Sequence, residues 1–410
     1  MIQKAFKYRI YPTEEQQAEL AKQFGCARFV YNRFVDTRKT TFLGTGKGVS
    51  FYDFKKQVTA LKQQPEFVWL KQADSQVLQA SLEDADRAYQ NFFRNHKNGT
   101  LPPVGKPRKD GMPKGYPRFW SKHDKQSIRY PQRFKFDGNT IYLPKVGWVK
   151  VIRHRRIEGL MKNCTVSKTK TGKFFVSIQC EIEHTVPEQK TGSIGVDLGL
   201  KDFATISDGT ETKKIACPKH LRKAEHLLQI RQRRLSRKVK GSNSRNKARL
   251  AVSAIHEKIT NRRKDFHHQL SRALVDSFGS IGLESLNVKG MVKNHNLAKS
   301  ISDAGWSQFV AFVEYKAAWA GSEVTKHDRW FASSKTCNDC GSINRELKLS
   351  DRTWVCQTCG VIHDRDENAA KNLRPNTVGT TGINAVRDMS SAVRHSAPEK
   401  FKTSLEAQWL

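Results

Sequence analysis

The run TGSIGVDLGLKDFATISDG, residues 191–209, decides the fold of the second half of the chain. It contains two apolar stretches around a glycine-containing turn, and the first stretch ends on Asp197. A similar stretch, SIGLE over residues 280–284, ends on Glu284. Short apolar runs bounded by turn residues are typical of buried strands. We therefore expect a new domain to begin after a polar joint at residues 183–190, with an acidic side chain at the end of each of two strands.

A third acid, Asp366, lies in HDRDENAAKNL, residues 363–373, where a helix is predicted to begin. Asp364 and Glu367 have the spacing of a helix-capping pair, which would leave Asp366 free in the first turn. Three such carboxylates can hold two Mg²⁺ ions about 3.5 to 4 Å apart for attack on a phosphodiester. Each acid taken singly is better explained as a surface or turn residue. Only their joint occurrence indicates a metal site, and His363 receives no role.

Two cysteine pairs, Cys337-x-x-Cys340 and Cys356-x-x-Cys359, are separated by fifteen residues. Two thiolate pairs on tight turns can close a tetrahedral zinc shell, and the alternative of free buried thiols fits this spacing poorly. With four sulfur ligands there is no open position for water, so we expect a structural Zn²⁺ in a zinc ribbon. The other cysteines are isolated and are interpreted as packing residues: Cys26, Cys164, Cys180 and Cys217.

The chain is strongly basic, with 73 Lys and Arg against 39 Asp and Glu and a net charge of +34 over 410 residues. Such a surface favours a polyanionic partner, and nucleic acid is the natural one. An anionic membrane is the alternative, but no apolar run approaches the roughly 18 to 20 residues of a membrane span. The opening segment also lacks the apolar core of a secretion signal. We therefore expect nucleic-acid binding, no membrane partner and a cytoplasmic location.

The first half of the chain combines strands with helices. AFKYRIYPT alternates like a strand, and a capping box at Thr13 predicts a helix start. A second helix is predicted from Ser75 to about Arg94, followed by an extended basic connector over residues 101–125 that should lie against a phosphate backbone. The runs RFKFD, TIYLPKVGWVKVIRH and FFVSIQCEIE predict a small antiparallel barrel. The helices would then be an insertion into that barrel.

Two intensely basic helical segments are predicted at Cys217 to Val239 and Ser244 to Asp276. Their outer face is a candidate nucleic-acid surface, and a solvated charged hairpin is the alternative. Little acid is interleaved, which favours nucleic-acid contact. The positions expected to be buried are Leu228, Leu235, Leu250, Ile255, Ile259, Phe266 and Leu270.

Four segments in this order closely resemble the TnpB (OrfB) proteins of bacterial insertion sequences, which are related to type V CRISPR effectors: GVDLGLKDFATISDG, GLESLNVKGM, the cysteine ribbon and HDRDENAAKNL. YPT-x-x-Q, GCARFVYN and LEDADRAYQNFF are similar to that family's opening segments, so the resemblance covers most of residues 1–374. It implies that Asp197, Glu284 and Asp366 are the Mg²⁺ ligands of an RuvC site. It also implies an RNA-guided DNA endonuclease that binds an element-derived guide RNA and cleaves guide-matched double-stranded DNA, with one protein per guide RNA favoured.

The resemblance implies a multidomain α+β fold. We expect a wedge-like β-barrel at 1–12 and 120–187, a helical recognition domain with the basic connector at 13–119, and an RNase H-like RuvC α/β nuclease domain at 188–374 with the zinc ribbon inserted at 333–362. Residues 375–410 show no sustained periodicity and are expected to form a disordered tail.

Protein contacts to a short duplex motif beside the target are also implied, because RNA-guided nucleases delegate the rest of sequence reading to base pairing. The candidates are Tyr52, Ser75, Gln76 and Gln79, since Gln can read adenine edges and Tyr can meet a thymine methyl. The alternative is that these side chains only cap or solvate helices.

Three rival functions share part of this pattern. An RNA-guided DNA-binding repressor would keep the fold without the acids, but all three acids are present. A strand-transferring transposase uses a similar acidic metal site and differs in whether water or a DNA 3′ hydroxyl attacks. A zinc-ribbon nucleic-acid-binding factor would explain the charge and the cysteines but not the acids at strand ends.

Overall fold

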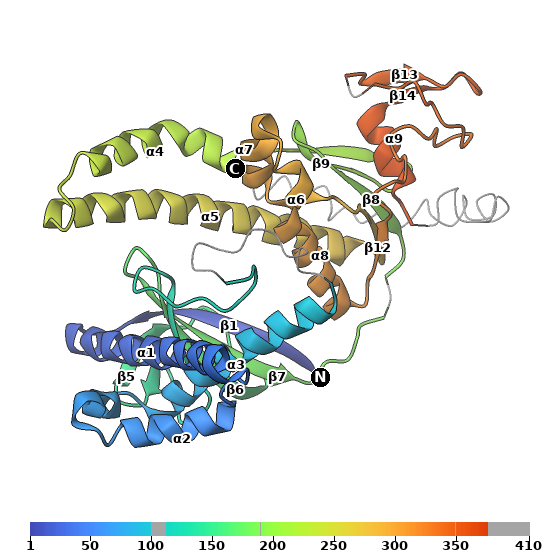
Figure 1. Ribbon diagram of the computed structural model, residues 1–410. Coiled ribbons are helices and arrows are strands. Elements are labelled where there is room, and N and C mark those ends of the chain that lie inside the picture. Colours follow the sequence, from blue (N-terminus) through green and yellow to red (C-terminus); the bar gives the residue numbers. More distant parts are fainter. Residues whose placement is uncertain (100–111, 189, 349, 376–410) are drawn as a thin grey trace. The chain divides into compact units, whose positions relative to one another are not determined.

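The computed structural model describes residues 1–99, 112–188, 190–348 and 350–375. The tail expected from residue 375 therefore lies almost wholly outside the described residues, as does the first part of the basic connector. The chain divides into two compact units, Met1–Glu183 and the part from His184 onward, and each is described by itself (Figure 1). None of the described helices is long and apolar enough to cross a membrane.

The first unit is built on a seven-stranded antiparallel sheet in the order β2-β6-β7-β1-β5-β4-β3. β1 pairs with β7 along nearly its whole length and with β5 only at its end. Alternate side chains of β1, namely Phe6, Tyr8 and Ile10, are buried in the core of this sheet. The predicted small barrel is thus confirmed as a half-barrel, and two of its strands, β2 and β6, were not predicted. The strands are β1 (Ile2–Tyr11), β2 (Gln126–Tyr130), β3 (Lys135–Asp137), β4 (Thr140–Leu143), β5 (Gly147–Ile152), β6 (Leu160–Lys168) and β7 (Phe174–Ile182).

The predicted helical insertion lies between β1 and β2. It contains α1 (Glu14–Thr45), α2 (Phe51–Leu61), a 3₁₀ helix (Pro65–Gln72) and α3 (Ser75–Lys97). The capping box is confirmed, because Gln16 N donates to Thr13 Oγ1 (3.3 Å) and Thr13 N donates to Gln16 Oε1 (3.1 Å). α1 packs on α3, with the rings of Phe34 and Tyr89 edge to face at 5.9 Å. α2 and the 3₁₀ helix were not predicted.

The described end of the basic connector is docked on α1. Trp120 stacks on Tyr31 with ring centroids 3.9 Å apart. Asn32 binds the backbone of Trp120 in both directions, at 3.0 and 2.7 Å. Phe119, by contrast, is 56% exposed. Of the three connector aromatics, Tyr116 and Trp120 are half-buried and only Phe119 is exposed.

The second unit contains a five-stranded sheet in the order β10-β9-β8-β11-β12. β8, β9 and β10 are antiparallel neighbours, whereas β11 runs parallel to both β8 and β12. This mixed sheet agrees with the expected RNase H-like fold. Its strands are β8 (Ser193–Leu198), β9 (Asp202–Ser207), β10 (Thr212–Ala216), β11 (Ser280–Glu284) and β12 (Glu323–His327). The helices are α4 (His220–Ser236), α5 (Asn243–Ser277), α6 (Val288–Met291), α7 (His295–Ala304), α8 (Trp306–Ala320) and α9 (Arg365–Asn372).

α4 and α5 form the long basic hairpin that was predicted (Figure 1). The predicted burial is confirmed for Leu228, Ile259, Phe266 and Leu270, whereas Leu235 and Ile255 are half-buried. The prediction is wrong for Leu250, which is 40% exposed. Only the second half of α5 contributes side chains to the core around the sheet. Leu250 lies in the first half, and apolar spacing alone does not show where the core ends.

The zinc-ribbon segment lies between β12 and α9, as predicted. It contains the short antiparallel pair β13 (Thr353–Val355) and β14 (Ile362–Asp364). β14 leads directly into α9, so the ribbon and the helix that carries Asp366 are covalently adjacent. The four cysteines predicted to be packing residues do not join this ribbon: Cys26, Cys164 and Cys180 are buried elsewhere, and Cys217 is half-buried.

Candidate metal centres and nucleic-acid interface

Asp197 and Glu284 come from neighbouring parallel strands. Asp197 is the penultimate residue of β8 and Glu284 is the last residue of β11, and Leu283 is the register partner of Val196. The two carboxylates therefore project from the same edge of the sheet. Asp366 belongs to the first turn of α9, which packs on β8 and β9.

The electrostatics of Asp197 tie the three acids together. Burial raises the pKa of its carboxyl group, and the negative charges of Glu284 and Asp366 raise it further, to about 7. Arg365 acts in the opposite direction. Burial also raises the pKa of Glu284. Buried, mutually repelling carboxyl groups are destabilised as anions, and a bound cation would relieve this.

These three carboxylates could hold divalent cations, because hard oxygen ligands suit Mg²⁺. They are not drawn tightly together. Among the described residues, the only groups of three or more metal-binding side chains with donor atoms within 4.8 Å of one another lie in the ribbon. The acids therefore fit a divalent cation by chemistry and charge, with a wider spacing than the ribbon cysteines.

Asp366 is engaged by two arginines. Its carboxylate accepts from Arg365 (3.1 Å) and from Arg352 of the ribbon (3.2 Å). The prediction that Asp366 is free in the first turn is therefore wrong. The contact with Arg352 could not be predicted, because the sequence does not show that the ribbon folds back over this turn. The predicted N-cap residue is confirmed, because Asp364 accepts from the backbone N–H groups of Asp366 (3.0 Å) and Glu367 (3.1 Å). The Glu367 side chain, predicted as the other half of the capping pair, contacts Lys214 instead.

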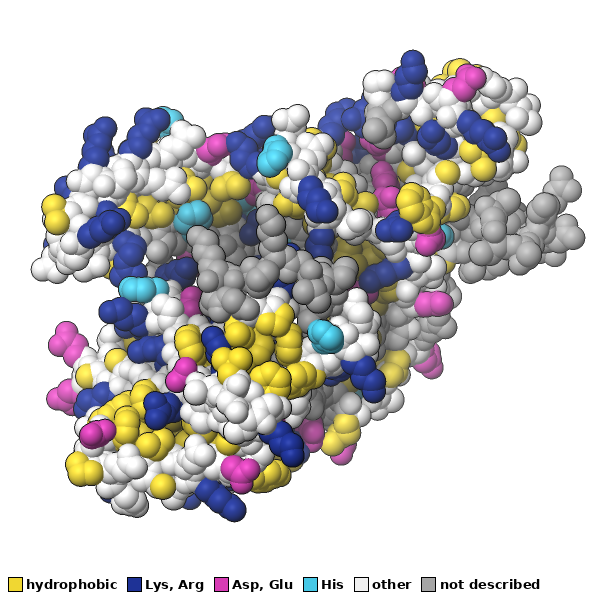
Figure 2. Space-filling view, in the orientation of Figure 1, with side chains coloured by type: hydrophobic (Ala, Val, Ile, Leu, Met, Phe, Trp, Pro, Cys, Tyr) yellow, Lys and Arg dark blue, Asp and Glu magenta, His cyan; other side chains and the backbone are white. Residues whose placement is uncertain are grey.

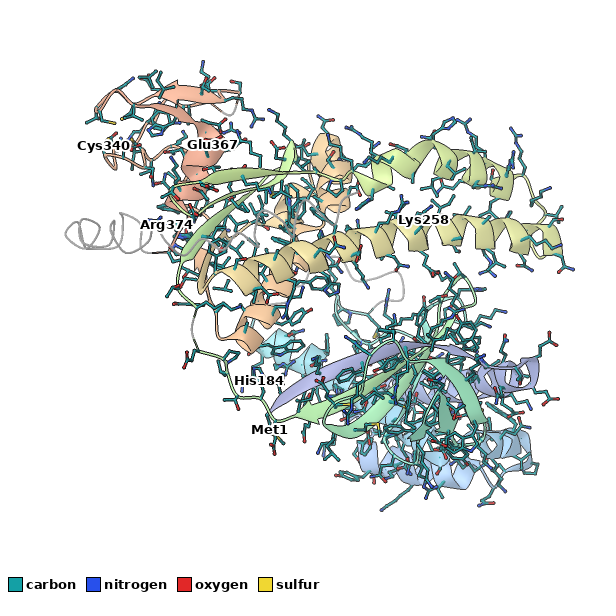
Figure 3. All side chains as sticks on the ribbon, turned by 180° about the vertical axis from the view of Figure 1, so that it is seen from behind. Met1, His184, Lys258, Cys340, Glu367 and Arg374 are labelled. Carbon is teal, nitrogen blue, oxygen red and sulfur yellow. The ribbon has the colours of Figure 1, made fainter. Side chains whose placement is uncertain are left out.

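The first turn of α9 is also tied to the sheet by a lysine that the sequence did not reveal. Lys214 of β10 contacts Asp364 at 2.8 Å and Glu367 at 3.1 Å. Figure 3 shows Glu367 on α9 and Arg374 just beyond its end. Lys214 thus holds the same turn that carries Asp366.

Glu284 lines a pocket of about 420 Å³. Lys326, Asp328 and Arg329 line the same pocket, together with Trp306 of α8. The pocket therefore has acidic and basic side chains beside Glu284, one of the candidate metal ligands. Its basic side chains suit a ligand that carries phosphate groups.

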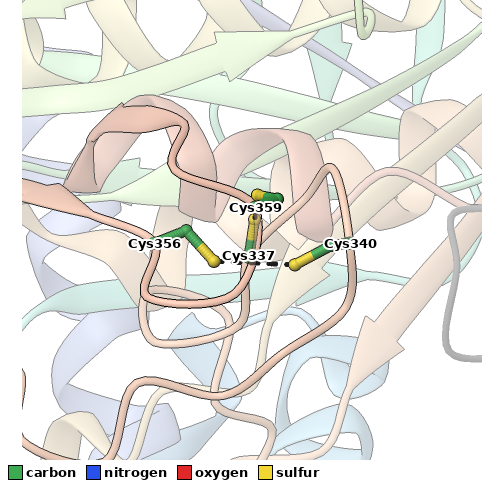
Figure 4. A group of neighbouring side chains, drawn as sticks. All are labelled: Cys337, Cys340, Cys356 and Cys359. Atoms are coloured by element: carbon green, nitrogen blue, oxygen red, sulfur yellow. Dashed lines mark hydrogen bonds between the residues drawn. The ribbon is translucent and has the colours of Figure 1, made fainter.

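The four ribbon cysteines converge on one point (Figure 4). Their sulfurs are 3.7 Å apart for Cys337 and Cys359 and 3.5 Å apart for Cys340 and Cys356. These separations are far longer than the roughly 2.05 Å of a disulfide, and all four are free thiols. Four sulfur donors at this spacing fit tetrahedral Zn²⁺, so the prediction of a zinc ribbon agrees with the structure.

The local structure of the ribbon favours the thiolate at Cys340 and Cys356, because hydrogen bonds from Ser342 lower the pKa of both thiols, whereas burial raises the pKa of Cys337 to about 12. The Ser342 hydroxyl lies 3.1 Å from Cys356 Sγ and lowers the pKa of that thiol to about 5. Gly341 and Gly360 have positive φ angles of 75° and 74°, and each donates its backbone N–H to the first cysteine of its pair at 2.9 Å. The two knuckle turns are therefore built as the sequence suggested.

His363, which received no role from the sequence, lies beside the zinc site. Its Nε2 is 3.0 Å from Cys337 Sγ, and its ring packs on Trp354 with centroids 4.7 Å apart. It is 7% exposed. His363 thus supports a zinc-binding cysteine from the residue immediately before the N-cap of α9.

The α4–α5 hairpin carries the densest basic surface that the sequence predicted. Figure 2 shows Lys and Arg side chains along it, and Figure 3 marks Lys258 on α5. Only two acids of the two helices are exposed, Asp265 and Asp276. The exposed basic residues from the start of α4 to the middle of α5 are Arg222, Lys223, Arg233, Arg234, Arg237, Lys238, Lys240, Lys247, Arg249, Lys258, Arg262 and Lys264.

The four candidate DNA-contact residues all belong to α2 and α3, which pack together. Tyr52 is 74% exposed, and Ser75 and Gln79 are also exposed. Gln76 is half-buried, and its Oε1 has no hydrogen-bond partner among the described residues. The N-cap of α3 is Asp74 rather than Ser75. A contact between these side chains and DNA stays a prediction.

Family models match three parts of the chain. They are described as "Helix-turn-helix domain" (residues 1–47), "Probable transposase" of the OrfB_IS605 type (177–295) and "Cas12f1-like, TNB domain" (306–373). The first of these ranges forms β1 and a single long helix, α1, in this structure.

The chain is similar to several curated relatives along nearly its whole length. A "Putative RNA-guided DNA endonuclease" of Streptomyces pristinaespiralis is 37% identical, covering 97% of this chain and 96% of that protein. The "Putative RNA-guided DNA endonuclease InsQ" of Escherichia coli K12 is 32% identical, covering 90% and 91%. "TnpB-like protein L770" of Acanthamoeba polyphaga mimivirus is 25% identical, covering 90% and 72%.

A solved structure has the same fold. It is the protein of the cryo-EM structure of a Cas12f1-sgRNA-target DNA complex, with a TM-score of 0.56, 14% identity and coverage of 91% of this chain and 98% of that one. The expected fold class, a β-barrel with a helical insertion followed by an RNase H-like α/β unit with a zinc ribbon, is thereby confirmed, with the barrel present as a half-barrel. The relatives that match nearly its whole length establish that the chain belongs to the TnpB (OrfB) family.

Proposed function

We propose that this protein is an RNA-guided DNA endonuclease that hydrolyses phosphodiester bonds at Asp197, Glu284 and Asp366. The observation that supports the proposal is that Asp197 and Glu284 lie at the same end of two neighbouring parallel strands while Asp366 lies on the helix that packs on β8, and that the charges of Glu284 and Asp366 raise the pKa of Asp197. Relatives that match nearly the whole chain are named as RNA-guided DNA endonucleases, which supports the same conclusion.

Two divalent cations bound to these acids would activate a water molecule and stabilise the departing oxygen. Two further features of the protein would assist this chemistry. Burial of Asp197 and Glu284 disfavours their charged forms without a cation and so favours cation binding. The pocket beside Glu284 contains Lys326 and Arg329, which can neutralise phosphates of a DNA strand.

The guide RNA and the target DNA would bind basic and polar surfaces of the protein. We assign the α4–α5 hairpin to nucleic-acid backbone contacts, because its exposed charge is almost wholly basic. Tyr52, Ser75, Gln76 and Gln79 are kept as candidates for reading the duplex motif beside the target. We further propose a wedge and recognition role for the first unit, one protein per guide RNA, and residence in the cytoplasm.

Strand transfer is the second candidate reaction, because the family model over residues 177–295 is described as a "Probable transposase". The acids would be the same, and the attacking group would be a DNA 3′ hydroxyl instead of water. A guided repressor is a third candidate, but its function would not require the three acids.

The test begins with the protein purified from cells that express its native locus. RNA that survives a high-salt wash is sequenced, and the complex is incubated with Mg²⁺ and a library of targets with varied flanking sequence. Guide-matched double-strand cutting supports the proposal. Joined strands in place of free ends would favour strand transfer, binding without cutting would favour the repressor, and absence of bound RNA would count against guidance altogether.

A further inference from the structure

Two buried asparagines join α9 to the zinc ribbon. Asn368 and Asn372 lie one helical turn apart on the same face of α9, and they are 1% and 5% exposed. A buried amide must have hydrogen-bond partners to offset its lost hydration. Both side chains find these partners in the ribbon.

The partners form a compact network. Asn368 Oδ1 accepts from the backbone N–H of Asn338 (3.0 Å), and its Nδ2 donates to the carbonyl oxygen of Thr336 (2.7 Å). Asn372 Nδ2 donates to the carbonyl oxygens of Ser333 (2.8 Å) and Thr336 (2.6 Å). Asn372 Oδ1 accepts from Asn338 Nδ2 (3.1 Å). Both amides therefore bind the same short stretch of backbone. We call this network, in which Asn368 and Asn372 bind residues 333–338, the clamp.

That stretch is the first zinc knuckle. Asn338 lies between Cys337 and Cys340, and Thr336 immediately precedes Cys337. The knuckle backbone is therefore held from one side by the cysteine cluster and from the other side by α9. Any shift of Cys337 must move the partners of both asparagines.

Only asparagine and glutamine end in an amide, whose NH2 group offers two donors beside a carbonyl acceptor. Aspartate at position 372 would set a carboxylate oxygen against the carbonyl oxygens of Ser333 and Thr336. Alanine at position 368 would leave the Asn338 N–H without the acceptor it has in this network, and alanine at either position would remove one of the two amide donors to the carbonyl oxygen of Thr336. An unsatisfied polar group costs more than the bond contributes. The chemistry of these positions is thus specific to the contact with the knuckle.

The clamped helix also carries Asp366. α9 spans only 8 residues, so Asp366 in its first turn moves with the helix that the two asparagines hold. The ribbon touches the carboxylate directly as well, through Arg352 at 3.2 Å. The position of Asp366 relative to Asp197 and Glu284 therefore depends on where the zinc knuckle lies.

We propose that Asn368 and Asn372 are positioning residues that couple the zinc knuckle to Asp366, so that zinc in the ribbon strengthens divalent-cation binding at the three acids. The coupling is reciprocal, since two linked binding equilibria share one coupling free energy. This inference rests on the proposed function, because it takes Asp197, Glu284 and Asp366 as the cation site.

The test measures Mn²⁺ binding to the zinc-loaded full-length chain by electron paramagnetic resonance, together with zinc content. The variants are Asn368→Ala and Asn372→Asp, and the matched control is Asn296→Ala, which removes an exposed asparagine from α7. The Mn²⁺ binding that is lost in Asp366→Asn is taken as the binding at the three acids. We expect the clamp variants to lower this affinity by roughly fivefold or more, as loss of a buried hydrogen bond implies, while the control keeps the wild-type affinity.

A double-mutant cycle separates coupling from two independent defects. Cys356→Ser should lower Mn²⁺ affinity in the wild-type background. In the Asn368→Ala background it should lower it much less, because the connection is already broken. Additive losses would overturn the coupling.

The outcomes also separate this inference from the proposed function. Wild-type Mn²⁺ affinity in both clamp variants, with or without retained zinc, would overturn the clamp alone. If Asp366→Asn leaves Mn²⁺ binding unchanged, then the cation site itself is misplaced, and the proposed function falls together with the coupling. Joint loss of zinc and Mn²⁺ in a clamp variant supports the coupling.

Discussion

Gly195 of β8 and Gly282 of β11 are register partners, and both lie directly beneath the end of α9. A Cβ atom at Gly195 would overlap the carbonyl oxygen of Ala370, and one at Gly282 would overlap that of Leu373. Without side chains, Gly195 and Gly282 leave a flat surface on the sheet against which the end of α9 packs, and we call this surface the seat. Through this seat β8 and β11, which carry Asp197 and Glu284 near their ends, hold the helix that carries Asp366.

Gly282→Ala should therefore destabilise the second unit and disturb the acids. Overpacking usually costs about 1 to 3 kcal/mol, and we expect the upper end here because the obstacle is backbone. Gly44→Ala is the matched control: this α1 glycine has free space around its Cα, so the change should be neutral or stabilise by up to about 1 kcal/mol. Thermal unfolding of both variants measures this. A Gly282→Ala protein as stable as the control would refute the seat.

Cys356→Ser should cost the ribbon its zinc. A structural zinc contributes folding free energy, so we expect a loss of several kcal/mol confined to the ribbon and α9. Hydrogen exchange should report it at the amides of Gly341 and Gly360, which bond within the two knuckles. Cys217→Ser, outside the cluster, is the control and should keep both zinc and protection. A fully stable, zinc-loaded Cys356→Ser protein would contradict a structural role for the metal.

The raised pKa of Asp197 predicts a pH-dependent stability in buffer without magnesium. The folded state keeps the proton up to about pH 7, whereas the unfolded state loses it near the ordinary value of 3.8. The free energy of unfolding should therefore fall as pH rises through this window, by at most about 1.4 kcal/mol per pH unit, and the effect is absent below it. Asp197→Asn should remove this dependence. Urea unfolding of both proteins at pH 5 and pH 8 isolates the contribution of the acid cluster, because groups remote from Asp197 titrate equally in both proteins. An identical pH difference in the two proteins would refute the assignment.

The α4–α5 hairpin should bind nucleic-acid phosphates. Replacing Arg233 and Arg234 by Gln together should weaken RNA binding and lower the slope of log affinity against log salt by roughly 1 to 2. Lys162→Gln is the control, because Lys162 is already paired with Glu181 at 2.7 Å. Titrations at several salt concentrations check this. An unchanged salt slope in the arginine variant would mean that the hairpin is only a solvated surface.

Features encoded by neighbouring residues could be predicted from the sequence. The strands that end on Asp197 and Glu284, the capping residue Asp364 and the paired cysteines each depend on a few adjacent positions, whose spacing reports directly on local structure. The overall order of barrel, helical insertion, nuclease-like unit and ribbon followed from these signals and from the family resemblance.

Contacts between distant segments could not be predicted. The pairing of Arg352 with Asp366 requires the ribbon to fold back over α9, and the exposure of Leu250 depends on where the sheet stops. The clamp did leave a signal, since Asn368 and Asn372 are spaced for one helical face. Two polar residues at that spacing are also typical of a solvated face, so burial decides between the two interpretations.

In the proposed function Asp197 acts in cleavage and not in guided binding. The most direct test compares wild type, Asp197→Ala and the control Glu181→Gln, each with its bound RNA and Mg²⁺, for binding and cutting of one guide-matched DNA. We predict that Asp197→Ala binds this DNA as wild type does and does not cut it, because the variant loses a metal ligand but no part of the basic surface. Cutting by Asp197→Ala at the wild-type rate would contradict the account.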